Sequence, residues 1–207
     1  FSFLHQVACQ TVVYLGVDVE RFSPQYERFF YAHELFDIDK SRKIIFYSGH
    51  MEERKGVRVI VQAAIQLFAQ ASAPNIHFLI CGNKAGEADV YLDVLKGSAA
   101  EPFVTFAGYR DDVDLLMRSS SIGVIASTGW DSFTMSSVEM MSSGLPLIVS
   151  NLQGLAETVE DAASGFKIEP GNASELARRI TELIQSDALR IQFSNTARSR
   201  ALEHFSA

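Results

Sequence analysis

IGVIASTGWDSFTMSSVEMMSSGLPLIVS, residues 122–150, contains an apolar run, a helical pattern and a second apolar run in direct succession. The runs Ile122 to Ala126 and Leu147 to Ser150 are nearly continuous in apolar residues, which is typical of strands buried on both faces. Between them, Thr134 to Ser143 has the apolar spacing of a helix. Strand, helix and strand in this order predict a βαβ unit with parallel strands.

The same alternation continues on both sides of this unit. Further short apolar runs predict strands at Val12 to Leu15, Lys43 to Tyr47, Ile76 to Cys81 and Phe103 to Phe106. Further helical patterns cover Val57 to Ala71, Ala88 to Leu95, Val113 to Arg118, Leu155 to Val159, Ser174 to Gln185 and Ala188 to Glu203. The chain is therefore predicted to form a doubly wound, Rossmann-like α/β parallel sheet with helices on both faces. The aromatic-rich stretch Phe22 to Asp39 has no clear pattern.

Composition narrows the class of protein. A length of 207 residues with 47% hydrophobic and 21% charged residues suits one soluble globular domain, residues 1–207. A net charge of −7 argues against nucleic acid as a partner, since phosphate backbones need clustered Lys and Arg. Two cysteines, Cys9 and Cys81, give no disulfide framework and favour a reducing, cytoplasmic compartment. No apolar run is long enough to span a bilayer, and the start at Phe1 without Met suggests a fragment.

Two acids stand out at the centre of the βαβ unit. Asp131 lies in the loop after the first strand, and Glu139 follows eight positions later in the predicted helix. Backbone N–H groups at a helix start bind phosphate oxygens, and carboxylates accept strong hydrogen bonds from sugar hydroxyls. A sugar nucleotide fits this combination. The alternative is structural, because acids near helix starts are common as caps and Glu139 can be an ordinary exposed helical residue.

Three more glycine-marked loops follow predicted strands, and loops at the carboxyl ends of parallel strands meet in one crevice. In SGHMEERKG, residues 48–56, Lys55 falls at a helix start and suits a diphosphate, although the run from Glu52 can equally be a solvated charged turn. In residues 80–86 and 106–113, glycine lets the backbone approach a flat ring, with Tyr109 and Arg110 near a base edge. A plain turn capped by Asp111 explains the last loop equally well.

Taken in order, these segments resemble the C-terminal, donor-binding domain of retaining family-four glycosyltransferases, the glycosyl transferases group 1 family with the GT-B fold. YLGVDVERFSP (14–24) resembles the opening segment of that domain, SGHMEERKG its phosphate loop, VTFAGYRDDV (104–113) its base loop and SGFKIEPGNASELARRI (164–180) its closing segment. Asp131 and Glu139 match its paired acids. The resemblance spans nearly the whole chain.

The resemblance implies transfer of a hexose from a nucleotide diphosphate sugar, UDP- or GDP-linked, with retention and without metal or other cofactor. Lys55 would neutralise the leaving diphosphate, assisted by His50 or Arg54. Glu139 would hold the ribose and Asp131 the transferred sugar. The remaining substrate-binding positions implied are Gly49, Gly82, Asn83, Tyr109, Arg110, Ser132, Phe133, Thr134 and Met135.

Three positions depart from the family pattern. Asp131 replaces the usual glutamate, Ser132 and Thr134 stand where glycine is usual, and His50 stands where the phosphate loop normally has arginine. The hexose pocket is therefore expected to differ. Whether His50 or Arg54 takes the place of the missing arginine is open from sequence.

The resemblance also implies an N-terminal acceptor domain outside this chain, which would bind a saccharide or lipid-linked acceptor in polysaccharide biosynthesis. The present domain is then expected to bind donor but turn over little. Any contact with a membrane surface would belong to the missing part. Two alternatives remain at this point, another GT-B enzyme such as a sugar-nucleotide epimerase or phosphorylase, and a non-catalytic nucleotide-binding module.

Overall fold

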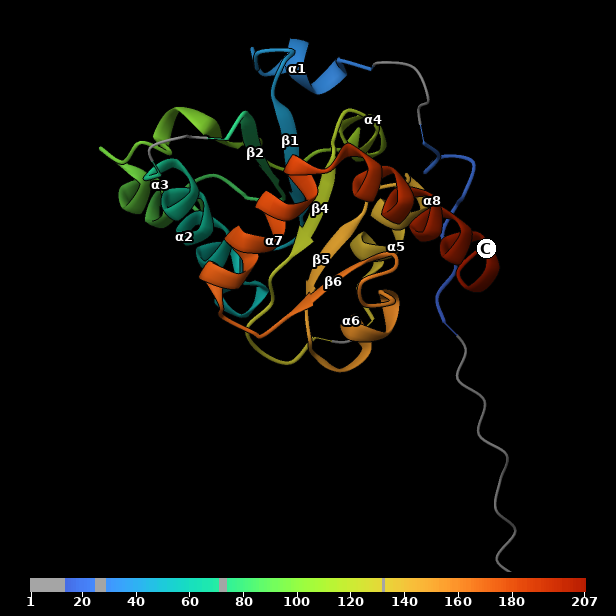
Figure 1. Cartoon of the computed structure of the whole chain (residues 1–207). Helices are drawn as coiled ribbons and strands as arrows, with labels where there is room; N and C mark the ends of the chain where they lie inside the picture. The colour runs from blue at the N-terminus through green and yellow to red at the C-terminus, as the bar shows by residue number, and fades with distance from the viewer. Residues whose placement is uncertain (1–13, 25–28, 71–73, 132) are drawn as a thin grey trace, which may run out of the picture.

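The computed structural model describes residues 14–24, 29–70, 74–131 and 133–207 (Figure 1). Within them, six strands form one sheet in the order β3-β2-β1-β4-β5-β6, and every neighbouring pair is parallel. The strands are β1 (Lys43–Ser48), β2 (Ile76–Cys81), β3 (Val104–Phe106), β4 (Ile122–Ile125), β5 (Leu147–Ser150) and β6 (Gly165–Ile168). This is the predicted doubly wound sheet.

Helices cover both faces of the sheet (Figure 1). One face packs against α2 (Val57–Phe68), α3 (Asp89–Leu95) and α7 (Ala173–Gln185). The other packs against α4 (Val113–Arg118), α5 (Met135–Ser142), α6 (Gln153–Thr158) and α8 (Asp187–His204). A short helix, α1 (Tyr31–Leu35), precedes β1. None of the helices in the described ranges is long and apolar enough to cross a lipid bilayer.

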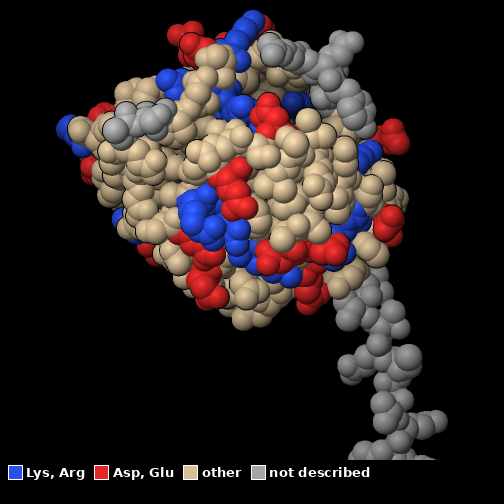
Figure 2. Space-filling model, viewed as in Figure 1, with Lys and Arg blue, Asp and Glu red and all other residues tan. Residues whose placement is uncertain are grey.

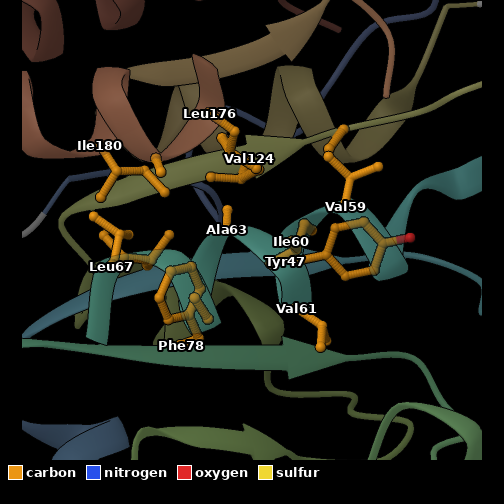
Figure 3. Close-up of a cluster of buried hydrophobic side chains, with 14 of the residues drawn as sticks. Tyr47, Val59, Ile60, Val61, Ala63, Leu67, Phe78, Val124, Leu176 and Ile180 are labelled. Carbon is orange, nitrogen blue, oxygen red and sulfur yellow. The ribbon is translucent and has the colours of Figure 1, made fainter. Parts of the chain in front are cut away.

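Alternation along the strands builds two cores from one sheet. In β1, Ile45 and Tyr47 belong to the α2/α7 core, whereas Ile44 and Phe46 belong to the α5/α8 core. Figure 3 shows the first core, where side chains from α2, from the strands β1, β2 and β4 and from α7, among them Leu176, lie together. The four β1 residues are at most 2% exposed, which is why this strand is a continuous apolar run in the sequence.

The predicted elements agree with the structure within a few residues at their ends, with three exceptions. The strand expected at Val12 to Leu15 is wrong in its described part, since Tyr14 and Leu15 are not in a strand. The strand β6 and the helix α1 were not predicted. β6 has only four residues, one of them a half-buried lysine, and it follows an irregular loop, so its period is too short to be read.

The topology places the loops of interest on one edge of the sheet. In the view of Figure 1, α1, which precedes β1, lies at the top, and α6, which follows β5, lies at the bottom. The loops after β1, β2, β3 and β4 therefore gather with α6 at the carboxyl edge. On the face seen in Figure 2, basic and acidic side chains intermingle instead of forming a field of one sign.

Candidate functional site

A cleft lies at the carboxyl edge of the sheet and consists of two adjoining hollows. The first has a volume of about 270 Å³ and its wall includes Lys55, Asp131, Phe133, Thr134 and Met135. The second has a volume of about 250 Å³ and its wall includes Cys81, Gly82, Lys84, Tyr109 and Arg110. Both share Ser48, Gly49, His50 and Ser136. The four predicted loops therefore do meet in one place.

The loop after β1 is held from below by buried tyrosines. The Tyr47 hydroxyl donates to the His50 carbonyl at 2.9 Å, and the Tyr91 hydroxyl donates to the Met51 carbonyl at 3.2 Å. Burial raises the pKa of the Tyr47 phenol well above its usual range. These hydroxyls therefore act as fixed neutral donors, and they shape a loop that exposes His50 to solvent at the junction of the two hollows.

A 3₁₀ turn, η1 (Glu53–Lys55), leads from this loop into α2. The next residue, Gly56, has φ +73°, and a Cβ placed there would lie 1.7 Å from the Ala126 carbonyl oxygen. Glycine is required here both by the left-handed backbone and by the approach of the chain that leaves β4. The turn and the loop after β4 are thereby packed backbone to backbone.

The charged centre of the first hollow is an ion pair. Lys55 Nζ lies 2.9 Å from Asp131 Oδ1, and the Ser127 hydroxyl donates to Asp131 Oδ2 at 2.6 Å. The two charged side chains are only 15% and 5% exposed. Both carboxylate oxygens are therefore satisfied, which is what a carboxylate needs at this depth. The lysine and the first acid, predicted to act together, are in direct contact.

The helix α5 begins beside this pair. Its N-cap is Thr134, and Thr134, Met135 and Ser136 line the first hollow. The start predicted from the sequence was Thr134, one residue earlier. Phe133 packs against Tyr14 and Phe205, with ring centroids 5.1 and 5.3 Å away. The helix start thus points its first turn at the cleft while Phe133 anchors it. Ser132, a predicted substrate-binding residue, lies outside the described residues.

Two linked loops, those after β2 and β3, form one side of the second hollow. Gly82 N donates to the Gly108 carbonyl at 2.8 Å, and Gly108 N donates to Asn83 Oδ1 at 2.9 Å. Asn83 is therefore a link between the loops, and it is not among the described residues of the wall. Gly82 has φ +111°, and a Cβ there would lie 2.1 Å from the Gly49 carbonyl oxygen. Tyr109 is 77% exposed at the rim.

Arg110 lines this hollow with its charge already neutralised. Its Nε donates to Asp112 Oδ1 at 2.8 Å, and the Tyr31 hydroxyl donates to the other carboxylate oxygen at 2.6 Å. The hydrogen bond from Arg110 lowers the pKa of Asp112 to about 2. Asp112, and not Asp111, is the N-cap position of α4, and its carboxylate is used for this network instead of capping the helix. The expected cap was therefore wrong.

Glu139, like Arg54 and Asn83, is a predicted site residue that the structure does not place on the described wall of either hollow. It lies three residues, close to one turn, beyond Ser136, which lines both. The side chain is partly buried, and burial raises the pKa of its carboxyl, opposed by the charge of Arg21. Glu139 is thus a partly buried acid one turn beyond the wall, and no residue of the described ranges donates a hydrogen bond to its carboxylate.

Sequence reasoning missed two serines of the site. Ser127 holds Asp131, and Ser136 separates the two hollows. The only signal for Ser127 was a polar residue directly after a buried strand, which many loops share. No group of three or more His, Cys, Asp or Glu side chains in the described part of the chain is placed to hold a metal ion.

Fold and cleft define a doubly wound α/β domain whose cleft lies at the carboxyl edge of a parallel sheet, where ligands of such domains bind. The profile of the glycosyl transferases group 1 family matches residues 32–200. This chain belongs to that family. Its fold is the C-terminal half of GT-B, as predicted.

Individual relatives are distant. The D-inositol 3-phosphate glycosyltransferase of Corynebacterium kroppenstedtii is 26% identical over 197 residues, which are 92% of this chain and 44% of the relative. The C-terminal domain of LpcC, a glycosyl transferase group 1 protein of Francisella tularensis, superposes with a TM-score of 0.78 at 20% identity over 92% of this chain and 99% of that domain. Anabaena HepE in complex with UDP-glucose gives a TM-score of 0.84 at 22% identity, covering 95% of this chain and 53% of HepE. The chain spans about half the length of such relatives.

Proposed function

We propose that the cleft binds a nucleotide diphosphate sugar, UDP- or GDP-linked, and that the domain is the donor half of a retaining hexosyltransferase that works without metal. The observation that carries this proposal is the Lys55–Asp131 pair at 2.9 Å, which lies in the wall of the first hollow together with the start of α5, while the second hollow adjoins the first. A cation, a carboxylate and helix N–H groups within one cleft are the recognition groups of diphosphate and polyol.

The diphosphate belongs at the junction of the hollows. His50, which stands where the family usually has arginine, lines both hollows, and Lys55 supplies a compact charge from the wall of the first hollow. The first turn of α5 adds backbone N–H groups and the positive end of the helix dipole. As the bond to the sugar breaks, negative charge grows on the leaving diphosphate. Fixed positive groups at that position stabilise the transition state more than the ground state.

The sugar and the nucleoside take the two ends of the cleft. Asp131, already oriented by Ser127, would accept hydrogen bonds from hexose hydroxyls once Lys55 turns to the diphosphate. Glu139 would hold the ribose, and the loops of Gly82 and Tyr109 would hold the base. Burial raises the pKa of the Glu139 carboxyl, and among the described residues none donates a hydrogen bond to it, so further donors would stabilise its ionised form. Ribose hydroxyls would supply the missing donors.

The acceptor is assigned to the part of the protein outside this chain. Relatives are about twice as long, and the Corynebacterium relative is named for D-inositol 3-phosphate, a phosphorylated polyol. We therefore assign a saccharide or other hydroxyl acceptor to the missing half, and little turnover to the isolated domain.

The first test is thermal denaturation with UDP, GDP, ADP and CMP. A ligand at about 100 times its Kd adds about 2.7 kcal/mol, which corresponds to a shift of roughly 5–10 °C for a domain of this size. One of the diphosphates is expected to give this shift. Lys55→Met should abolish it, and Lys96→Met, an exposed lysine outside both hollows, should keep it. No shift with any nucleotide would refute the proposal.

The second test separates the two acids. Glu139→Gln should weaken binding of the bare nucleoside diphosphate about tenfold, the worth of one hydrogen bond to a charged group. Asp131→Asn should leave that binding within a few-fold and instead remove the extra affinity of the sugar nucleotide. Isothermal titration of UDP and UDP-glucose, and of GDP and GDP-mannose, measures both. The opposite order of effects would overturn the assignment of the acids.

A further inference from the structure

Arg54 lies next to the cleft, but its side chain is used elsewhere. Its Nε donates to the Glu52 carboxylate at 2.8 Å, and its Nη1 donates to the Trp130 carbonyl at 3.0 Å. Among the described residues, those that line the two hollows do not include Arg54. The guanidinium is thus bound on two sides by groups of the protein.

The backbone of Arg54 holds the same loop. Thr128 N donates to the Arg54 carbonyl at 2.8 Å, and a Cβ on Gly129 would lie 3.1 Å from Arg54 Cβ. The next residue, Lys55, contacts Asp131. Two successive residues of η1 therefore bind two successive residues of the loop after β4. Arg54 contacts Trp130 and Lys55 contacts Asp131, so the two segments pair residue by residue.

We propose that Arg54 is a positioning residue that fixes residues 128–131 on η1 and so sets the place of the Asp131 carboxyl, and that it is not a ligand of the diphosphate. The chemistry suits this role, because a planar guanidinium presents donors on two edges at fixed angles and satisfies a carboxylate and a carbonyl together. An ammonium lacks this geometry. His50 is left as the side chain that replaces the usual arginine.

This inference predicts a split between the two ends of the donor. The proposed function places the diphosphate at Lys55 and the hexose at Asp131, and only the latter depends on residues 128–131. Arg54→Lys should therefore lower affinity for the sugar nucleotide about tenfold, the worth of one charge-assisted hydrogen bond, with the bare nucleotide within twofold. If Arg54 were a phosphate ligand, its substitution would lower the affinities for the sugar nucleotide and for the bare nucleotide equally. Arg54→Lys would then bind both more tightly than Arg54→Gln, because lysine keeps the positive charge.

A direct test needs no nucleotide. Trp130 is the only tryptophan of the chain, and it is 69% exposed, so its fluorescence reports on the loop that Arg54 holds. Time-resolved anisotropy should show at least twofold more fast depolarisation in Arg54→Lys and in Arg54→Gln. Arg58→Lys is the matched control, because Arg58 donates to Glu53 at 2.9 Å and is an arginine of the neighbouring helix start. It should match the wild type.

Nucleotide affinity and tryptophan anisotropy together show whether the positioning role of Arg54 or the proposed donor function is wrong. Unchanged anisotropy in folded Arg54→Lys overturns the positioning role, whatever the nucleotide data show. If the glutamine variant does not fold, Glu52→Ala, which removes one anchor of the guanidinium, must give the same gain in mobility or the inference is wrong. Absence of any nucleotide binding in the wild type counts against the donor function alone. His50→Arg should strengthen binding of UDP and UDP-glucose equally, and no gain in either would count against the role given to His50.

Discussion

The substitution Gly56→Ala tests a backbone contact next to the wall of the cleft, which we call the seam. The seam is the backbone contact between η1 and the chain that leaves β4. The Cβ of alanine would lie 1.7 Å from the Ala126 oxygen and 2.4 Å from its carbon, where ordinary contact begins at 3.4 Å. Backbone atoms cannot rotate away as a side chain end can, so the two segments must separate by well over 1 Å. The residue must also adopt φ +73°, which is strained for any L side chain.

The cost has two parts that can be measured separately. The left-handed backbone costs about 1–2 kcal/mol for a non-glycine residue. Forcing apart a packed seam adds about 1–3 kcal/mol. Gly97→Ala is the matched control, since Gly97 has φ +74° and no atom lies within 4 Å of its Cβ position. Gly97→Ala should therefore show the first part alone, and Gly56→Ala about 2–5 kcal/mol in all.

Equilibrium unfolding in urea measures both variants at constant m-value. Because Lys55 precedes Gly56 and pairs with Asp131, the opened seam should also weaken sugar-nucleotide binding, and Gly97→Ala should leave it unchanged. Equal destabilisation by the two alanines would refute the account of the seam. If Gly56→Ala binds the sugar nucleotide as the wild type does, the backbone contact at Gly56 does not position the binding site.

Two further predictions concern stability. Burial lowers the pKa of His77 to about 4. Below pH 6.5 the unfolded chain therefore binds a proton at this histidine that the folded chain does not bind. The free energy of unfolding should fall by up to about 3 kcal/mol between pH 6.5 and 4. His77→Gln should flatten this fall in urea titrations while exposed His204→Gln keeps it, and parallel profiles would contradict the assignment. Arg198 donates to the Phe22 carbonyl at 2.9 Å and to other carbonyls around it, so Arg198→Met should cost about 2–4 kcal/mol by leaving them unpaired. Exposed Arg178→Met should cost under 1 kcal/mol, and similar losses in both variants would show that those carbonyls find water instead.

The site was predicted from the sequence only as a set of loops. Glycine after each of several strands indicated where the loops turn, and the Lys55 and Asp131 positions followed from the motifs. The pairing of these two side chains, 76 residues apart, depends on the order of β1 and β4 in the sheet. Arg54 and His50 were equivalent candidates for phosphate. The tertiary structure distinguishes them, because the guanidinium of Arg54 is hydrogen-bonded to the Glu52 carboxylate and the Trp130 carbonyl.

What the sequence by itself determined is the layered sheet, because strands buried on both faces must be apolar throughout and helices covering them must repeat every three to four residues. The spacing of apolar residues shows which faces of each strand and helix are buried, and these buried faces determine how the layers pack. Which charged groups meet was decided by the tertiary structure alone. Partners such as Lys55 and Asp131 come from segments far apart in the chain. Their contact depends on places where two backbone segments lie too close for a side chain between them, as at Gly56, and such places produce no periodic pattern in the sequence.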